Sequence, residues 1–199
     1  MLFIKTYLLV STLLFFCLFA KSQVKNLNAT KTNQSVKIDG NLTDEAWKNV
    51  PYVTDFVTAQ PVFGNISAHK TEVKVIYDNE AIYVAAYLYD NPETIRKQFT
   101  ERDKLDRQDV DIFTIGFDTY QDRLNAFVFR VSSAGVQGDT KISNSSTYDV
   151  TWDAVWDSKV SFKKDGWLVE LKIPFSAIRF AKTSVQNWGI NFSRFERAT

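Results

Sequence analysis

The sequence predicts an all-β protein, an antiparallel β-sandwich of jelly-roll type with a few short helices. Three observations favour this fold class. Apolar and polar residues alternate with a period of two along several short segments, turn residues separate these segments, and no amphipathic helix longer than about two turns is found. The 199 residues, of which 45% are hydrophobic and 24% charged, are enough to bury one hydrophobic core.

Residues 1–22 are predicted to be a secretory signal peptide. Lys5 precedes an apolar run from Tyr7 to Ala20, and the run ends in the small-x-small cleavage site Ala20-Lys21-Ser22. The run is about 14 residues long, whereas a membrane-spanning helix needs about 20. We therefore expect export to the periplasm, the outer-membrane surface or the extracellular space. The single cysteine, Cys17, lies in this segment, so the rest of the chain is expected to fold without a disulfide.

The residues that follow are predicted to form an arm and a short helix. Residues 23–35 are polar and aperiodic, which is typical of a polar N-terminal arm, and a sandwich domain is expected at residues 36–199. Thr43 is predicted to cap a short helix, in which Leu42 packs on Trp47. Trp47 is therefore expected in the core.

Strands are predicted where the alternation is regular, at residues 72–77, 81–89, 109–117, 124–132, 155–162, 167–173 and 188–195. The segment Ala81–Tyr89 (AIYVAAYLY) is apolar on both faces, so it is predicted to lie deep in a packed sheet. A strand of an outer-membrane barrel would need polar, lumen-facing residues at alternate positions, which this segment lacks.

Composition and charge exclude several classes of function. The formal net charge of +1 gives no electrostatic basis for binding a nucleic acid, so no nucleic-acid partner is expected. One histidine, one methionine and one cysteine are too few for thiol chemistry, a His-rich zinc site or a His-centred triad. The histidine, His69, is predicted to be solvated in a polar loop.

The segment Ser143–Asp157 (SNSSTYDVTWDAVWD) carries the aromatic candidates for ligand binding. Tyr148, Trp152 and Trp156 stand among Ser, Asn and Asp residues. Flat rings beside short polar side chains suit a sugar, because its apolar face stacks on a ring and its hydroxyls bind the polar groups. A place in the core is an equal alternative for Trp156.

The segment Glu101–Asp111 (ERDKLDRQDVD) carries the charged candidates, with eight of its eleven residues charged. Arg102, beside Asp103, can present a planar fork of donors to a polar ligand. A solvated loop with local ion pairs is the alternative.

Carboxylates suggest two further possibilities. Asp118 and Asp122 flank an acidic turn and are weak candidates for a structural calcium ion, for which Asx-turn capping is the alternative. A glycoside hydrolase would need two facing carboxylates, and sequence alone cannot pair the candidates. These candidates are Asp109, Asp111, Asp153, Asp157 and Glu170.

An ordered set of motifs resembles a known family. IDGNLTDEAW is followed by VIYDNEAIYVAAYLYD, DVDIFTIGFDTYQDRLNAFVFRVSSAGVQGD, WDAVWDSKV, GWLVELKIPFSAIRF and WGINFSR. This set is similar to the carbohydrate-binding module family 9-like domain, in the version found at the N-terminus of large secreted or outer-membrane proteins of Gram-negative bacteria. The resemblance covers residues 36–194.

The resemblance implies a β-sandwich that binds sugars, in some members with calcium. It also implies that two Trp rings clamp a terminal sugar while Arg, acidic and amide side chains hold its hydroxyls. Trp152 or Trp156 would supply one ring and Arg102 the fork. A second ring is not evident, because Trp47 and Trp167 are both expected in the core.

Three functions remain open at this point. The leading hypothesis is a secreted, non-catalytic module that binds a polysaccharide or oligosaccharide, linked to glycan breakdown or uptake by a longer parent protein. Proteins of the resembling family continue beyond WGINFSR, so the chain is expected to be the recognition part of such a protein. The alternatives are a structural module that packs on a downstream outer-membrane barrel, and a glycoside hydrolase that cleaves O-glycosyl bonds.

Overall fold

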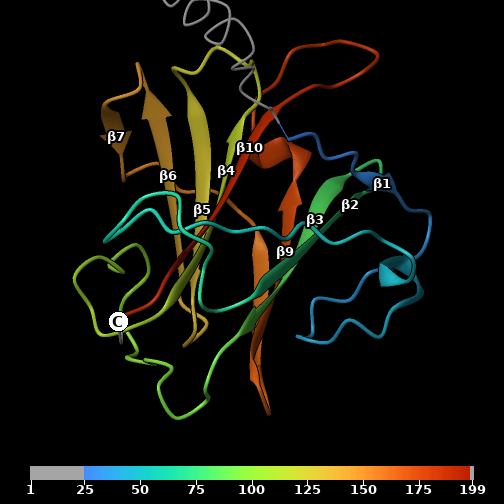
Figure 1. Cartoon of the computed structure of the whole chain (residues 1–199). Helices are drawn as coiled ribbons and strands as arrows, with labels where there is room; N and C mark the ends of the chain where they lie inside the picture. Colours follow the sequence, from blue (N-terminus) through green and yellow to red (C-terminus); the bar gives the residue numbers. More distant parts are fainter. Residues whose placement is uncertain (1–24, 198–199) are drawn as a thin grey trace, which may run out of the picture.

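The computed structural model describes residues 25–197, which form two five-stranded sheets packed face to face (Figure 1). The predicted β-sandwich is confirmed. The predicted signal peptide, residues 1–22, lies outside the described residues. Within residues 25–197 no helix is both long and apolar enough to cross a membrane.

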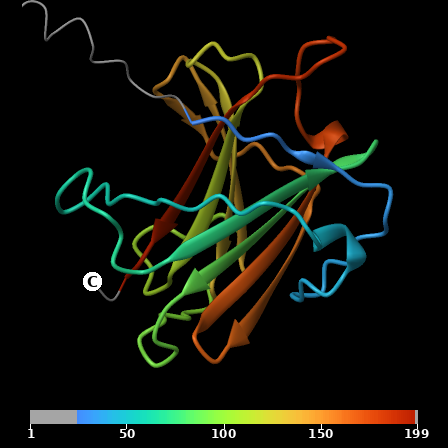
Figure 2. The same ribbon diagram turned by 45° about the vertical axis from the view of Figure 1, so that its right-hand side comes forward.

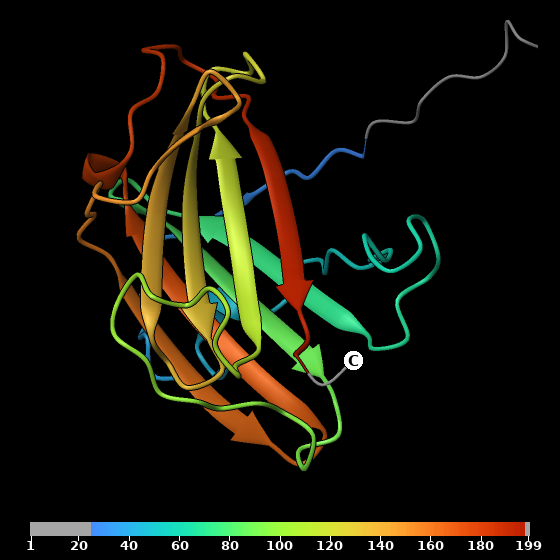
Figure 3. The ribbon, with the colours of Figure 1, turned by 90° about the vertical axis from the view of Figure 1, so that its left-hand side faces the viewer.

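Both sheets are antiparallel apart from one short parallel pair, β1 with β2. The first sheet has the order β1 (Thr30–Lys31), β2 (Thr71–Tyr77), β3 (Ala81–Tyr89), β9 (Gly166–Pro174), β8 (Asp157–Lys163). The second has the order β10 (Gly189–Phe195), β4 (Ile112–Asp118), β5 (Ala126–Ser132), β6 (Gln137–Ser143), β7 (Thr147–Asp149). Two short 3-10 helices complete the described elements, η1 (Glu45–Trp47) and η2 (Phe175–Ala177). The strands of the two sheets cross at an angle (Figure 3).

The hydrophobic core lies between the sheets. Alternate residues of the central strands point inward, and each fully buried large side chain contributes about 1.5–3 kcal/mol to stability. Among them are Leu88, Phe113, Phe129, Trp167 and Leu171, all fully buried. The predicted core position of Trp167 is confirmed.

Strand β3 is buried on both faces, as its sequence predicts. Its inner face, with Val84 and Leu88, joins the core between the sheets. Its outer face, with Tyr83, packs against a second cluster that includes Trp47. The segment at residues 36–50, light blue in Figure 2, lies beside this sheet and covers its outer face. Trp47 is 1% exposed, so its predicted core position is also confirmed.

A buried carboxylate holds this covering segment in place. The Glu170 side chain, 0% exposed, accepts hydrogen bonds from the backbone N–H groups of Asp39 (3.1 Å), Gly40 (2.7 Å) and Asn41 (3.2 Å), and from Trp47 Nε1 (3.1 Å). Burial raises the pKa of Glu170, and these donors act in the opposite direction. This candidate hydrolase acid is therefore a structural anchor.

The short helix differs in detail from the prediction. It begins one position later than expected, with Asp44 at the N-cap, and no side-chain hydrogen bond caps it. Thr43 is therefore not the cap. Leu42 packs against the same cluster as Trp47, as expected.

Strand β6 was not predicted, because its core-facing positions are polar. Residues paired across neighbouring antiparallel strands share a face. Gln137 pairs with Val131, Asp139 with Phe129, and Lys141 with Phe127. These three polar side chains therefore face the same way as core residues of β5. The short strands β1 and β7 were not predicted either.

Candidate functional site

A polar cluster gathers around Arg102, in the loop between β3 and β4. Arg102 Nη1 donates to Gln137 Oε1, and Nη2 lies 2.6 Å from Asp139 Oδ1 and 3.2 Å from Asp153 Oδ1. Nη2 also lies 3.1 Å from the Ala154 carbonyl oxygen. The guanidinium group is thus held by residues of β6 and of the segment between β7 and β8.

Asp139 is the centre of this cluster and is 0% exposed. Besides the bond from Arg102, its carboxylate accepts hydrogen bonds from the Ala154 N–H at 2.7 Å and from Trp156 Nε1 at 3.1 Å. The Asp139 N–H donates to Asp103 Oδ1 at 2.9 Å. A buried carboxylate needs such pairing to offset its desolvation. The Arg102 side chain is 38% exposed, so a fixed cation reaches the solvent.

A surface hollow of about 640 Å³ opens beside this guanidinium group. We call it the Arg102 hollow, and it is lined by Phe99, Thr100, Glu101, Arg102, Gly135, Val136, Gln137, Trp156, Asp157 and Ser158. The ring of Phe99 is 79% exposed. A hydrogen bond from Lys104 lowers the pKa of Glu101, which keeps an ionised acceptor at the rim. The volume of the Arg102 hollow falls in the range of about 300–1,000 Å³ that is usual for small-molecule sites.

The predicted aromatic residues are placed differently from one another. Trp156 is 5% exposed and meets Phe129 edge to face at 5.2 Å between ring centroids, so no face of its ring is free to stack on a sugar. Trp152 is half-buried against Phe127 and Phe129, with 5.3 and 5.8 Å between the ring centroids. Tyr148, on β7, is 64% exposed. Neither Trp152 nor Tyr148 lines the Arg102 hollow.

The structure therefore brings together Arg102, Asp103 and Trp156, with Trp156 as a buried hydrogen-bond partner. The lining residues that the sequence analysis did not single out include Phe99, Gln137 and Ser158. Its place two residues before the charged run that starts at Glu101 could have indicated Phe99. Nothing in the sequence indicated Gln137, which depends on the pairing of β6.

The predicted calcium candidates cap their own turn. Asp118 accepts the backbone N–H groups of Asp122 (3.2 Å) and Arg123 (2.8 Å). Asp122 accepts those of Leu124 and Asn125, both at 2.8 Å. The side-chain bond from Asn125 and these backbone bonds lower the pKa of Asp122. This is Asx-turn geometry, and calcium binding at this turn stays a prediction.

Another group in the described part of the chain has the composition of a metal site. His69, Asp90 and Glu196 each offer one ligand atom, and these three atoms lie within 4.8 Å of one another. Arg194 already pairs with Asp90, and its Nε lies 2.8 Å from Glu196 Oε1, so both carboxylates have a cation beside them. His69 Nδ1 lies 3.0 Å from Glu196 Oε2. His69 lies in a loop with its side chain 37% exposed, as predicted, but it is not alone there, because Glu196 lies beside it.

Comparisons with known proteins agree with this architecture. The family model described as "Carbohydrate family 9 binding domain-like" matches residues 38–199. A carbohydrate binding module family 9 from Caldicellulosiruptor kristjanssonii, solved in complex with cellotriose, is 19% identical with a TM-score of 0.55, over 82% of this chain and 73% of that chain. The module from the same organism solved with glucose is 18% identical, with a TM-score of 0.55. The match covers 84% of this chain and 76% of that chain.

A solved protein from Bacteroides uniformis ATCC 8492 has a higher TM-score of 0.64, at 12% identity, over 87% of this chain and 84% of that chain. No curated protein sequence matches. At these identities the solved structures establish the fold, whereas the family model establishes the relationship.

Proposed function

The chain belongs to the carbohydrate family 9 binding domain-like family, and from this premise we propose that it is a non-catalytic carbohydrate-binding module whose site is the Arg102 hollow. One observation carries the choice of site: an open Phe99 ring and a fixed guanidinium fork line the same hollow. The structural neighbours solved with cellotriose and with glucose support a saccharide as the ligand.

The hollow offers the groups that a sugar ring needs. The apolar face of a pyranose stacks on Phe99, and its hydroxyls meet donors and acceptors on the walls. A guanidinium group has five N–H donors, and in Arg102 the second hydrogen of Nη1 remains for a ligand. The hydroxyl of Ser158 and the carboxylates of Glu101 and Asp157 supply acceptors.

Arg102 is fixed before any ligand arrives, which favours binding. Its fork is held by Asp139, which is itself held by Ala154 and Trp156. Ordering a long side chain on binding costs about 0.5–1.5 kcal/mol, and a side chain that is already fixed avoids this cost.

The carboxylates favour binding over hydrolysis. A glycoside hydrolase needs one carboxylic acid with a raised pKa next to the scissile bond. Glu170 and Asp111 have raised pKa values because they are buried, but each accepts backbone N–H bonds inside the protein. Glu101, at the rim of the hollow, has a lowered pKa. These acids act as structural anchors and as acceptors.

Calorimetry with cellotriose and glucose tests the proposal. We expect weak binding, between about 1 μM and 1 mM, as for one small polar site. Phe99→Ala and Arg102→Lys should each weaken cellotriose binding about tenfold, because they remove the ring and the fork while keeping the fold. Phe63→Ala is the matched control, since Phe63 is 82% exposed and lies outside the hollow.

Binding of cellotriose that survives both Phe99→Ala and Arg102→Lys would refute this site. Loss of binding in Trp152→Ala alone would move the site to the segment that the sequence analysis favoured. The absence of binding to any glycan on an array would refute the carbohydrate-binding function itself.

One observation favours a second function, that of an interaction module. The loop at residues 57–66 exposes four apolar side chains, Val57 (52%), Val62 (58%), Phe63 (82%) and Ile66 (89%). Such an apolar group is typical of a surface that contacts another protein or domain. In that case Phe63→Ala would weaken association with the rest of a longer parent protein and leave cellotriose binding unchanged.

The proposed setting is outside the cytoplasm. It depends on residues 1–22, whose sequence is typical of a signal peptide. There the module would hold a glycan for breakdown or uptake by a longer parent protein, with association at the outer membrane through that protein. Fractionation of cells that express the chain tests the export.

A further inference from the structure

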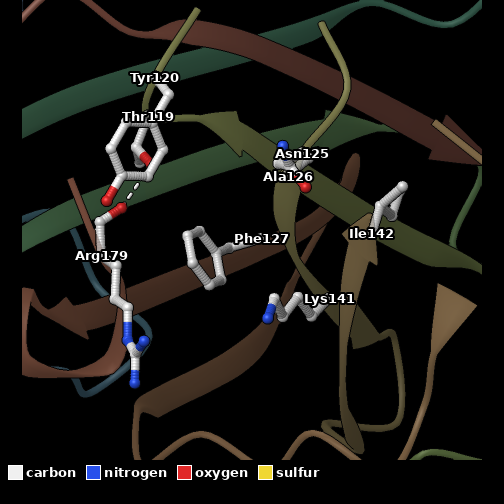
Figure 4. A pocket seen from close by; sticks show the side chains of 8 residues that line it. All are labelled: Thr119, Tyr120, Asn125, Ala126, Phe127, Lys141, Ile142 and Arg179. Carbon is white, nitrogen blue, oxygen red and sulfur yellow. Dashed lines mark hydrogen bonds between the residues drawn. The ribbon is translucent and has the colours of Figure 1, made fainter. Parts of the chain in front are cut away.

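A second pocket lies toward the other end of β6 (Figure 4). We call it the Arg179 pocket; its volume is about 190 Å³. It is lined by Thr119, Tyr120, Asn125, Ala126, Phe127, Lys141, Ile142 and Arg179. The hydroxyl of Thr119 donates to the backbone carbonyl of Arg179, which ties the segment after η2 to the turn after β4.

The lining of this pocket carries positive charge and no carboxylate. Lys141 and Arg179 are both present, and Figure 4 shows their charged ends on either side of the Phe127 ring. Neither takes part in any ion pair or side-chain hydrogen bond found among residues 25–197. Their donors are therefore available to a ligand.

Acids near the pocket are occupied by other groups. Asp122 accepts the backbone N–H of the lining residue Asn125 at 2.8 Å and its side-chain amide N–H at 2.6 Å. Asp149 of β7 is the cross-strand partner of Lys141. Its Oδ1 accepts two hydrogen bonds from Thr151, from the backbone N–H at 3.0 Å and from the hydroxyl at 2.7 Å. It moderates the charge of Lys141 without lining the pocket. Two unpaired cations around a concave surface attract an anion.

The pocket also has an aromatic wall. Tyr120 is 53% exposed, and Figure 4 shows its ring at the side of the pocket opposite Lys141. Phe127, at the base, is buried and backed by Trp152, with 5.3 Å between ring centroids. An inorganic anion has no apolar face that could stack on an aromatic ring, whereas a sugar ring has one. The volume, below the usual range of about 300–1,000 Å³, limits the ligand to about one ring.

We infer that the Arg179 pocket binds a monosaccharide unit that bears a carboxylate, a uronate, with its carboxylate held by Arg179 and Lys141 and its ring on Tyr120. The anion site stands without the proposed function, and the choice of a sugar as the carrier of the carboxylate rests on it. The Arg102 hollow, with Glu101 and Asp157 in its lining, differs in charge and suits neutral sugars.

Calorimetry on the full chain with glucuronate, glucose and inorganic phosphate tests this inference. We expect glucuronate to bind at least about tenfold more tightly than phosphate, and its affinity to fall as salt increases, because exposed charges are screened. The double variant Lys141→Gln/Arg179→Gln should weaken glucuronate binding about tenfold or more and leave cellotriose binding unchanged. Lys182→Gln is the matched control, since Lys182 is exposed and lies outside the pocket.

Each other outcome overturns a defined part of the inference. Glucuronate that binds equally well to the double variant refutes the pocket as its site. Phosphate that binds as tightly as glucuronate refutes the sugar ring as part of the ligand. Glucuronate binding that is lost in Arg102→Lys and kept in the double variant assigns it to the Arg102 hollow. A wild-type chain that binds glucuronate but not cellotriose refutes the Arg102 hollow as a cellotriose site and leaves the Arg179 pocket standing as the uronate site.

Discussion

Two buried carboxylates in this protein do different work. Glu170 and Asp139 are both 0% exposed. Glu170 is bound by three backbone N–H groups and an indole N–H and makes no ion pair found among residues 25–197. It fastens residues 36–50 to the first sheet. Asp139 is bound by Arg102, whose side chain is 38% exposed. Glu170 therefore anchors a segment of the chain, whereas Asp139 fixes a surface arginine, which is a ligand donor in the proposed site.

The largest expected effect is on stability, from Glu170→Ala. The change leaves two buried donors, Gly40 N–H and Trp47 Nε1, and the part-buried Asp39 N–H without this acceptor. We therefore expect the free energy of unfolding to fall by about 3–5 kcal/mol. Urea denaturation measures this loss. Glu93→Ala, at an exposed position, should change it by less than about 0.5 kcal/mol. The folded fraction of Glu170→Ala should bind cellotriose normally, and weaker binding would contradict the purely structural role.

A smaller change in stability, joined to a change in binding, is expected from Asp139→Asn. The carboxylate that pairs with the Arg102 cation becomes a neutral amide, which should cost about 2 kcal/mol of stability. Because the fork is then held less firmly, cellotriose affinity should fall about tenfold. If Asp139→Asn loses stability but binds cellotriose as tightly as the wild type, Asp139 does not position a ligand-binding Arg102.

The smallest effect is a dependence on pH that Glu170 alone should cause. Burial raises the pKa of Glu170 above its ordinary value of 4.5, so the folded protein holds this proton more tightly than the unfolded chain does. The contribution of Glu170 to stability is therefore greatest below this value and decreases as the pH rises through the raised pKa. Since Glu170→Gln cannot lose a proton, the stability of the wild type relative to this variant should fall as the pH rises from about 4 to about 7. A constant difference would contradict the raised pKa.

Periodicity predicted the parts of the fold that bury apolar side chains. The apolar pattern of Ala81–Tyr89 predicts a strand buried on both faces, and the structure confirms it. Residues 36–50 cover the outer face of this strand, and they include Trp47, which the sequence also predicts in the core. In the same way the alternation around Trp167 located β9. In each case burial requires apolar side chains at the positions that face the core, and these side chains form the pattern seen in the sequence.

The candidate site could be predicted only in part. Arg102 and Asp103 were found because charge is dense in their loop, and the structure joins them to Asp139. Gln137 and Asp139 were not found, because a strand whose core-facing residues are polar has no hydrophobic period to detect. Trp156 was ambiguous because sequence does not reveal the partner of its indole N–H, which is the buried Asp139.

The polar face of β6 sets a distance for recognition. Gln137 lines one site and Lys141 the other, both on the same face of one strand. Four residues of extended chain span about 13 Å, at about 3.3 Å per residue. An oligosaccharide that occupies both sites would need its acidic unit about that far from its neutral end. The two contacts would then reinforce each other through effective concentration, so that two weak subsites select for the spacing of charge along a glycan.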